Sequence, residues 1–269
     1  MKKLGLIAGM GELPIAIASE AKAQGYKVFA VALEPLADRS LSSYVDEISR
    51  INVGKFGKLI DILKKNSIHE AVMAGKVSKS LLYKSKITPD LRAAKLLFSL
   101  RDRSDDTILM AITKELKKEG INLLDITTFT SGILAPEGVI TRDSPTEGEW
   151  KDIIFGWKIA KEIGRLDIGQ TVVVKNQAVM SVEAIEGTDE AVRRGGKLAG
   201  KGAVVVKVSK PDQDMRFDVP AIGLNTIRAM AEVSAGVLCV EANKSILLNK
   251  GKIIEESKGA GISVVGYAG

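Results

Sequence analysis

Residues 210–220 form a polar block in which side chains suited to phosphate chemistry lie close together. Asp214 and Asp218 are four residues apart in a segment bounded by two prolines, so their carboxylates can converge on one Mg²⁺ ion. Lys210 and Arg216 can then contact phosphate oxygens. Such a metal would orient a water molecule for attack on phosphorus. A solvent-exposed cluster of salt bridges is the alternative interpretation of the same pattern.

A second candidate anion site follows the first apolar run, Leu4–Ala8, which is typical of a β-strand. Gly9, Gly11 and Glu12 lie between that strand and an expected helix. Small residues there let a phosphate approach backbone N–H groups at a helix N-terminus. The spacing matches neither the dinucleotide fingerprint nor the P-loop. A simple tight turn is the alternative, and Glu34 at the end of the next expected strand leaves a nicotinamide-binding oxidoreductase open.

A third polar segment, residues 183–189, precedes an expected helix over residues 188–198. Thr188 is placed to cap that helix through its hydroxyl group. Arg194, on the same helix, can reach an anion. Capping alone is the simpler interpretation of this segment.

Composition restricts the chemistry further. The chain of 269 residues has one Cys and one His, which nearly excludes a Cys/His zinc site and rules out an internal disulfide. An enzyme of this composition must rely on carboxylates, lysines, arginines or a hard cation. Hydrophobic residues make up 45% and charged residues 27%, which is typical of a globular protein. No apolar run reaches the ~20 residues of a membrane span, so we expect a cytoplasmic protein.

The net charge of +6 is concentrated in one stretch. Residues 75–103 contain eight basic and two acidic side chains, together with leucines, a tyrosine and a phenylalanine. A basic and apolar surface suits an anionic membrane or an anionic amphiphile. An ordinary amphipathic helix with a solvated lysine face is the alternative. Nucleic acid is disfavoured because aromatic residues are only 4% of the chain.

Apolar periodicity predicts an α/β protein. In the first half, strands and helices alternate, as in a doubly wound parallel sheet: strands over 4–8, 27–33 and 70–74, and helices over 14–24, 57–66 and 105–119. A stretch rich in Pro and Gly follows. We therefore expect a Rossmann-like domain over 1–135, a linker over 136–148, and a distinct smaller α/β domain over 149–269.

In the second half of the chain, the expected strands and helices follow a different order. Expected helices cover 149–163, 188–198 and 224–234, and expected strands cover 171–175, 178–184, 203–208 and 237–241. A further hairpin is expected over 245–254, around Asn249-Lys250-Gly251.

The chain resembles the LpxI-type UDP-2,3-diacylglucosamine diphosphatases of lipid A biosynthesis. The matching residues fall into groups along the chain, and the last two groups, over 182–189 and 210–223, are together specific for that family. From N- to C-terminus the matching residues are Gly5–Gly9 with Gly11 and Leu13-Pro14; Met73–Gly75; Asp105-Asp106; Leu134–Pro136 with Gly138; Asp167–Gln170 with Val172–Val174; Val182–Ala184 with Glu186–Asp189; and Lys210-Pro211 with Gln213-Asp214, Arg216, Asp218, Pro220 and Ile222-Gly223.

The resemblance implies a Rossmann-like domain and a second domain that hold the substrate between them. It implies Mg²⁺-dependent hydrolysis of UDP-2,3-diacylglucosamine to UMP and 2,3-diacylglucosamine 1-phosphate (lipid X). Asp218 is the residue it marks as essential. Substrate contacts are expected from Gly9, Gly11, Glu12, Lys76, Gln170, Thr188, Asp189 and Arg194.

The chain departs from the family pattern at two places that matter for these assignments. Lys76 stands where the family usually has Arg, and Asp212 stands where it usually has Gly. The additional carboxylate leaves the choice of metal ligands open. Peripheral association with the inner membrane and a homodimer are further expectations, and a non-catalytic carrier of a nucleotide-linked lipid is the alternative function.

Overall fold

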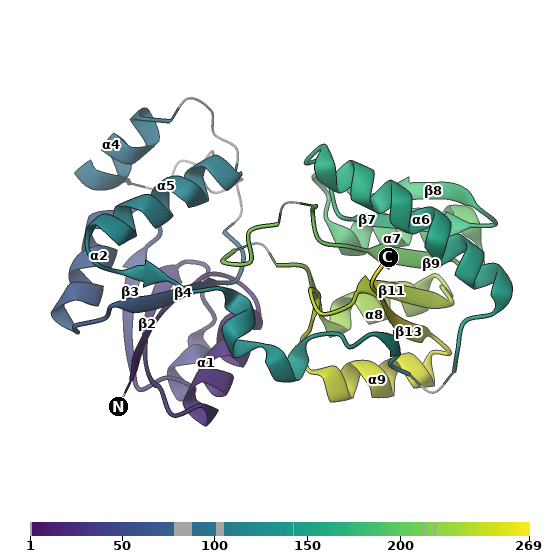
Figure 1. The fold of residues 1–269 in the computed structure, drawn as a ribbon, viewed down its shortest axis with the longest axis horizontal. Coiled ribbons are helices and arrows are strands. Elements are labelled where there is room, and N and C mark those ends of the chain that lie inside the picture. The colour runs from purple at the N-terminus through teal and green to yellow at the C-terminus, as the bar shows by residue number, and fades with distance from the viewer. Residues whose placement is uncertain (1, 78–87, 101–104, 142, 212, 218) are drawn as a thin grey trace. The chain divides into compact units, whose positions relative to one another are not determined.

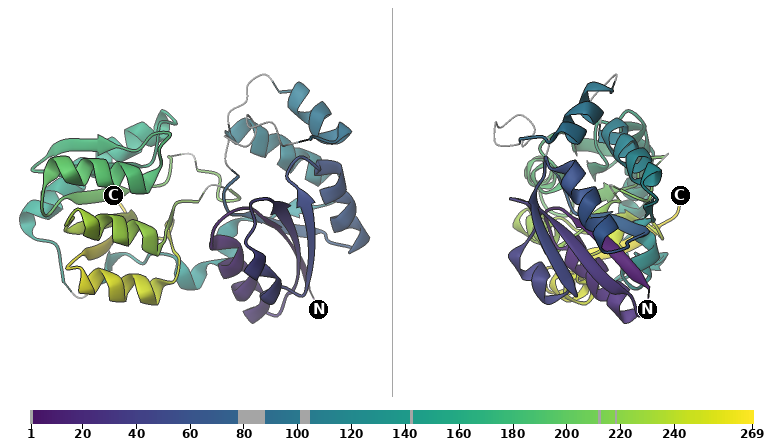
Figure 2. Two further views of the ribbon diagram at one scale, coloured as in Figure 1. Left: turned by 180° about the vertical axis from the view of Figure 1, so that it is seen from behind. Right: turned by 90° about the vertical axis from the view of Figure 1, so that its left-hand side faces the viewer.

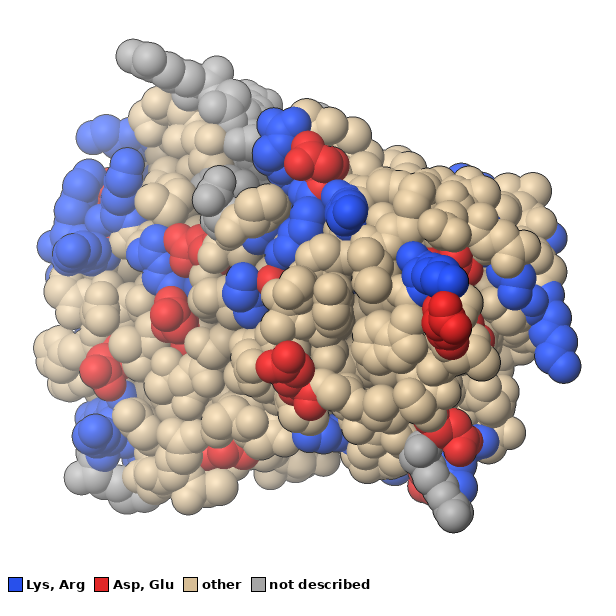
Figure 3. Space-filling view, turned by 45° about the vertical axis from the view of Figure 1, so that its right-hand side comes forward, with Lys and Arg blue, Asp and Glu red and all other residues tan. Residues whose placement is uncertain are grey.

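The computed structural model describes residues 2–77, 88–100, 105–141, 143–211, 213–217 and 219–269 (Figure 1). The chain divides into two compact units of nearly equal length, so the second is not the smaller domain expected. The first unit contains Met1–Thr130 and Met215–Asp218, and the second contains Ser131–Asp214 and Val219–Gly269. On the face drawn in Figure 3, charged side chains of both signs are distributed over the surface.

The first unit is built on a five-stranded sheet in the order β3-β2-β1-β4-β5. All neighbouring strands are parallel. Because β2 and β4 lie on opposite sides of β1, the strand order reverses there, and open α/β sheets bind ligands at such a point. The strands are β1 (Lys3–Ala8), β2 (Lys27–Glu34), β3 (Glu47–Asn52), β4 (Glu70–Ala74) and β5 (Asn122–Leu123).

Helices cover both faces of this sheet (Figures 1 and 2). Helices α2, α4 and α5 contribute to one apolar core with alternate strand residues, whereas α1 packs with η2 on the opposite face. This is the expected Rossmann-like arrangement. The helical elements are α1 (Leu13–Ala23), η1 (Arg39–Ser43), α2 (Phe56–Lys65), α4 (Leu91–Phe98), α5 (Asp105–Lys118) and η2 (Ile126–Phe129).

The second unit has a six-stranded mixed sheet in the order β6-β13-β11-β9-β7-β8. Strands β9, β11 and β13 are parallel, and β7, β8 and β6 run antiparallel to their neighbours. These strands are β6 (Gly138–Val139), β7 (Thr171–Lys175), β8 (Ala178–Val182), β9 (Val204–Lys207), β11 (Val237–Glu241) and β13 (Ser263–Tyr267); β10 (Ala221–Ile222) and β12 (Ile246–Leu247) form a separate parallel pair.

Alternate residues of the second sheet enter two different cores. Val204 and Val206 pack with α6, whereas Val205 packs with α7, α8 and α9 on the other face. Gly156 of α6 lies so close to the sheet that a Cβ there would be 2.9 Å from Val206 Cγ2. The helical elements are η3 (Ser131–Ile133), α6 (Glu147–Arg165), α7 (Thr188–Ala199), α8 (Leu224–Glu232) and α9 (Lys250–Gly259).

Two expectations about the second half differ from the structure. The hairpin expected over 245–254 is wrong: β12 pairs with β10, and α9 begins at Lys250. Asn249 adopts a left-handed conformation before a helix instead of within a turn between strands. Residues 136–148, expected to be a linker, contain β6, which pairs with β13 and therefore lies within the second unit.

Candidate functional site

The loops that follow β1 and β4 are joined at the carboxyl end of the first sheet. Met10 N donates to Lys76 O and Lys76 N donates to Met10 O, each at 2.9 Å. Gly9 N also donates to Ala74 O at 2.8 Å. The structure thus brings Gly9 and Lys76, both expected to contact substrate, to one place at the reversal of strand order.

The glycines of these loops have different structural roles. A Cβ on Gly9 would lie 2.7 Å from Lys76 O, so Gly9 permits the close approach of the two loops. Gly11 has a φ of +102° and open space where its Cβ would be. Glu12 occupies the N-cap position of α1 and makes no side-chain cap hydrogen bond. The backbone around Gly11, at the start of α1, is therefore the part of this loop that a phosphate can approach.

The polar block at 210–220 is divided between the two units. Lys210 and Asp214 belong to the second unit, and Arg216 belongs to the first. Phe217 enters the apolar core of the first unit and is only 4% exposed. Burial of this aromatic side chain explains why a four-residue piece of the block is part of the first unit.

The two basic residues of the block have different neighbours. Lys210 Nζ forms an ion pair with Asp167 Oδ1 at 2.6 Å. Arg216 Nη2 donates to the sulfur of Met110 on α5 at 3.4 Å. Asp218 lies outside the described residues, as does Asp212, so the expected pairing of Asp214 with Asp218 keeps the status of a prediction.

A buried polar chain lies at the carboxyl end of β9. Lys207 Nζ donates to Thr188 Oγ1 at 2.6 Å, and Thr188 Oγ1 donates to Glu183 Oε1 at 2.8 Å. Burial alone would raise the pKa of Glu183, but the Lys207 ammonium and the hydroxyl hydrogen bond outweigh it, so the net pKa is lowered. The N-cap of α7 is Gly187, and Thr188 is the first helical residue. The sequence-based assignment of Thr188 as the cap is therefore wrong, because its hydroxyl is used between Lys207 and Glu183.

A second buried carboxylate lies at the end of β11, on the α6 face. Glu241 Oε2 accepts from Lys161 Nζ at 2.5 Å and from both the backbone N and the Oγ of Ser209 at 2.8 Å. Lys244 Nζ lies 3.0 Å from Glu241 Oε1. Burial acts to raise the pKa of Glu241, but these cations and donors lower it overall. This network holds Ser209, the residue immediately before Lys210.

The remaining expected substrate contacts lie in the second unit with partners of their own. Asp189 Oδ1 accepts from Thr226 Oγ1 at 2.7 Å and so joins the start of α7 to α8. Arg194 donates to Val182 O at 2.9 Å and pairs with Glu186 at 2.5 Å. The Gln170 carbonyl accepts from the backbone N that follows β9.

Most of the titratable side chains in this protein that could bind a metal ion are carboxylates, since the chain has one His and one Cys. Among the residues that the structure describes, no three Asp, Glu, His or Cys side chains are grouped closely enough to hold an ion. Mg²⁺ is commonly bound by one or two carboxylates plus substrate phosphates and water, not by a dedicated protein cage. Asp214, the acidic residue of the block that lies within the described ranges, could supply one such carboxylate. Cys239 is buried, and burial raises the pKa of its thiol, which suits a packing role.

Sequence reasoning did not select Lys207 or Glu241 as site residues. Lys207 lies within the apolar run expected as a strand over 203–208, Glu241 ends the one over 237–241, and each is itself buried in the structure. A charged residue at that position must be paired to be tolerated. The sequence therefore indicated that Lys207 and Glu241 need partners, but the identity of those partners depends on tertiary packing.

Two family descriptions together cover nearly the whole chain. The LpxI N-terminal domain matches residues 3–133, and the LpxI C-terminal domain matches residues 136–265. The UDP-2,3-diacylglucosamine pyrophosphatase LpxI of Caulobacter vibrioides is 34% identical over 277 residues, which covers 99% of this chain and 98% of that protein.

Two solved structures that match this chain resemble it only weakly. UDP-glucose-4-epimerase from Stenotrophomonas maltophila, with bound NAD and formylated UDP-arabinopyranose, has a TM-score of 0.31 at 11% identity over 45% of this chain and 35% of its own. Phosphoribosylglycinamide synthetase from Anaerococcus prevotii has a TM-score of 0.28 at 14% identity over 71% of this chain and 34% of its own. Likeness at this level carries no functional inference. The full-length relative and the two matching domains show that this chain is an enzyme that belongs to the LpxI family.

Proposed function

We propose that this chain hydrolyses the pyrophosphate bond of UDP-2,3-diacylglucosamine to give UMP and 2,3-diacylglucosamine 1-phosphate, a step of lipid A biosynthesis. The observation that carries the proposal is the relative named for this substrate, which aligns with 99% of the chain at 34% identity. The polar block supports it, because it combines carboxylates with Lys210 and Arg216, the residue types that a pyrophosphate requires.

The chain's own residues would act mainly by binding and orienting the pyrophosphate. Lys210 and Arg216 would neutralise charge on phosphate oxygens as it increases in the transition state. The backbone near Gly11, at the start of α1, would contact a phosphate through N–H groups. Glu241 would position Ser209 and therefore the adjoining Lys210 backbone, through hydrogen bonds of 2.8 Å.

Magnesium dependence is part of the proposal. Asp214 and Asp218 would hold the ion, whose chemistry is to neutralise phosphate charge and activate a water molecule. Removal of divalent cations with EDTA is expected to abolish hydrolysis, and Mg²⁺ to restore it. Asp214→Asn is expected to raise the Mg²⁺ concentration for half-maximal activity at least about tenfold, since a neutral amide is a weaker ligand than a carboxylate.

The decisive test is phosphorus NMR of UDP-2,3-diacylglucosamine incubated with the pure protein, Mg²⁺ and ¹⁸O-labelled water. We expect cleavage, with the label in 2,3-diacylglucosamine 1-phosphate. Label in UMP would keep the reaction but place the attack on the other phosphorus. Asp218→Ala is expected to remove turnover while substrate binding and the circular dichroism spectrum are kept. Full activity of that variant, or no cleavage by the unaltered protein, would overturn the proposal.

We also propose that the protein associates peripherally with an anionic membrane, as its lipid substrate requires. None of the helices in the described ranges is long and apolar enough to cross a membrane. Support comes from the excess of basic residues over 75–103, of which residues 78–87 and 101–103 lie outside the described part of the chain. A homodimer stays a sequence-based prediction, to be tested by sedimentation.

A further inference from the structure

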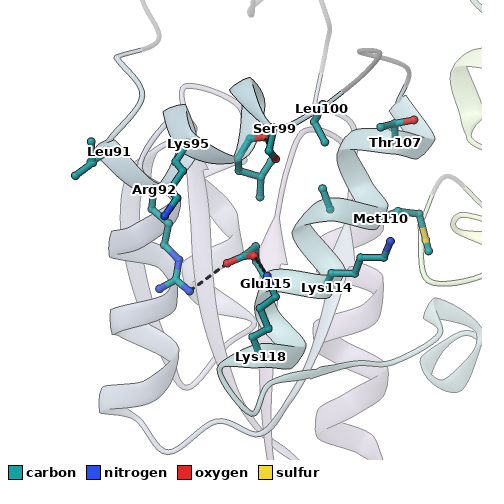
Figure 4. A pocket seen from close by; sticks show the side chains of 12 residues that line it. Leu91, Arg92, Lys95, Ser99, Leu100, Thr107, Met110, Lys114, Glu115 and Lys118 are labelled. Carbon is teal, nitrogen blue, oxygen red and sulfur yellow. Dashed lines mark hydrogen bonds and ion pairs between the residues drawn. The ribbon is translucent and has the colours of Figure 1, made fainter.

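Helices α4 and α5 of the first unit enclose an open groove of about 1080 Å³ (Figure 4). Ligand pockets commonly measure about 300–1000 Å³, so this groove is large enough for a sizeable ligand. All of its lining residues belong to the first unit and to the described part of the chain. Its location differs from that of the Gly9 and Gly11 loop and of the buried carboxylates of the second unit.

The lining of the groove is largely apolar. Leu91, Leu96 and Leu100 contribute from α4 and the residues that follow it, and Met110 and Ala111 contribute from α5. Leu96 belongs to the core of the first unit, and Leu100 and Ala111 pack against that core. The floor of the groove is therefore supported by packed side chains, while Leu91 remains 88% exposed at its edge.

The rim of the groove is basic. Figure 4 shows Arg92 and Lys95 extending from α4, and Lys114 and Lys118 extending from α5. Glu115 is the acidic residue of the lining, and it pairs with Lys118 at 2.5 Å and with Arg92 at 3.4 Å. Arg92 pairs more closely with Glu119, at 2.5 Å, so the excess of positive charge around the groove comes from Lys95 and Lys114. An apolar groove with such a rim is complementary to a ligand with an apolar tail and an anionic head.

One end of the groove reaches the polar block. Met110 lines the groove, and its sulfur accepts a hydrogen bond from Arg216 Nη2 at 3.4 Å. Both residues belong to the first unit. A ligand whose phosphate contacts Arg216 would therefore have an apolar surface directly beside it, at Met110.

We infer that the α4–α5 groove binds an acyl chain of the lipid substrate, with Arg216 at the end nearest the phosphates. The inference rests on the proposed function, because it takes the acyl chain from the proposed substrate. Burial of an alkyl chain is favourable in proportion to the apolar area removed from water, so the groove would set the preference for long-chain substrates. The apolar lining, the basic rim and the contact between Met110 and Arg216 together favour an acyl chain as the ligand of this groove.

The test compares two tryptophan substitutions that fill the groove with one substitution outside it. Ala111→Trp fills the groove from α5, and Ser99→Trp fills it from the exposed end of α4 without entering the core. Phe98→Ala is the matched control: Phe98 is also on α4 and 85% exposed, but it is not part of the lining. Circular dichroism and thermal unfolding establish that each variant is folded.

For each protein, kcat/KM is measured with detergent-dispersed UDP-2,3-diacylglucosamine and with the analogue in which both acyl groups are acetyl. The unaltered protein is expected to prefer the long-chain substrate. Both tryptophan variants are expected to lose at least about tenfold of that preference, the effect of about two buried CH₂ groups. Phe98→Ala is expected to keep it. Unchanged preference in both tryptophan variants would overturn the inference.

A second readout does not depend on turnover. Calorimetric binding of monomeric dodecyl phosphate is expected for the unaltered protein and Phe98→Ala, and to be at least about tenfold weaker for both tryptophan variants. If neither substrate is cleaved, the proposed function fails, and this binding experiment still decides whether the groove takes an alkyl chain. If all three variants lose binding to anionic phospholipid vesicles but bind dodecyl phosphate normally, the surface docks a membrane and the acyl-chain inference is wrong.

Discussion

Lys207 and Thr188, nineteen residues apart in the chain, are joined by a hydrogen bond of 2.6 Å in the interior of the second unit. Lys207 is 7% exposed and Thr188 is 8% exposed. The Thr188 hydroxyl in turn donates a hydrogen bond to Glu183. The end of β9, the start of α7 and the segment before α7 are therefore fixed relative to one another. Lys207, Thr188 and Glu183 therefore interact as one group at the carboxyl edge of the sheet. We expect the effects of substitutions in this group on the free energy of unfolding to be coupled.

Lys207→Met is expected to lower the free energy of unfolding by about 1–3 kcal/mol, because it leaves buried oxygens of Thr188 and Glu183 without their cationic neighbour. In a double-mutant cycle, Lys207→Met with Glu183→Gln is expected to cost less than the sum of the single changes. Urea unfolding measures all four proteins. Lys197→Met, at an exposed position of the same α7, is the control and is expected to change stability little. Strict additivity would show that Lys207 and Glu183 act independently.

Acid is expected to destabilise the second unit through Glu183 and Glu241. The folded-state pKa of each is lowered, so their contribution to stability is complete above the ordinary pKa of about 4.3 and is lost as the pH falls through the lowered value. Urea unfolding followed from about pH 7 to about pH 3 measures this loss. Glu241→Gln is expected to be less stable at neutral pH but to lose less stability in acid. An unchanged acid slope in that variant would contradict the assignment.

Gly9→Ala is expected to destabilise the first unit by about 1–3 kcal/mol, because its Cβ would lie 2.7 Å from Lys76 O and push the two loops apart. The same change should weaken substrate binding if the Gly11 backbone contacts phosphate. Gly132→Ala is the control, since no atom lies within 4 Å of its added Cβ. Thermal unfolding and KM report the two effects. Equal melting temperatures for the two variants would mean that the loops tolerate separation.

Lys210→Met is expected to lower kcat/KM about 100-fold or more, because it removes a proposed cationic contact to phosphate. Asp167→Asn is expected to lower it less than about tenfold, because Asp167 is 55% exposed and orients the Lys210 ammonium from 2.6 Å. Steady-state kinetics of both variants give the comparison. Equal losses would indicate that the pair has a structural role and that Lys210 does not contact the substrate.

Those parts of the candidate site that depend on neighbouring residues in the chain could be predicted from the sequence. The glycine loop after β1 and the start of α1 are consecutive in sequence, and helix α7 has a periodic pattern of its own; turn chemistry and apolar periodicity are local properties. The pairing of Met10 with Lys76 was not readable, because it joins loops that only strand order brings together. Likewise, Asn249-Lys250-Gly251 resembles a hairpin turn. However, Ile253 packs into the core that the second sheet forms with α7 and α8, which favours the helix α9.

The sequence by itself determined the alternation of strands and helices, the parallel first sheet and the family, since these follow from short-range periodicity and from residue identities along the chain. Tertiary structure alone decided that the 210–220 block is shared between two units, because burial of Phe217 in the core of the first unit depends on residues far away in sequence. It also decided the partners of Lys207 and Glu241. A buried charge must be compensated, but only the packing of neighbouring elements selects which side chain compensates it.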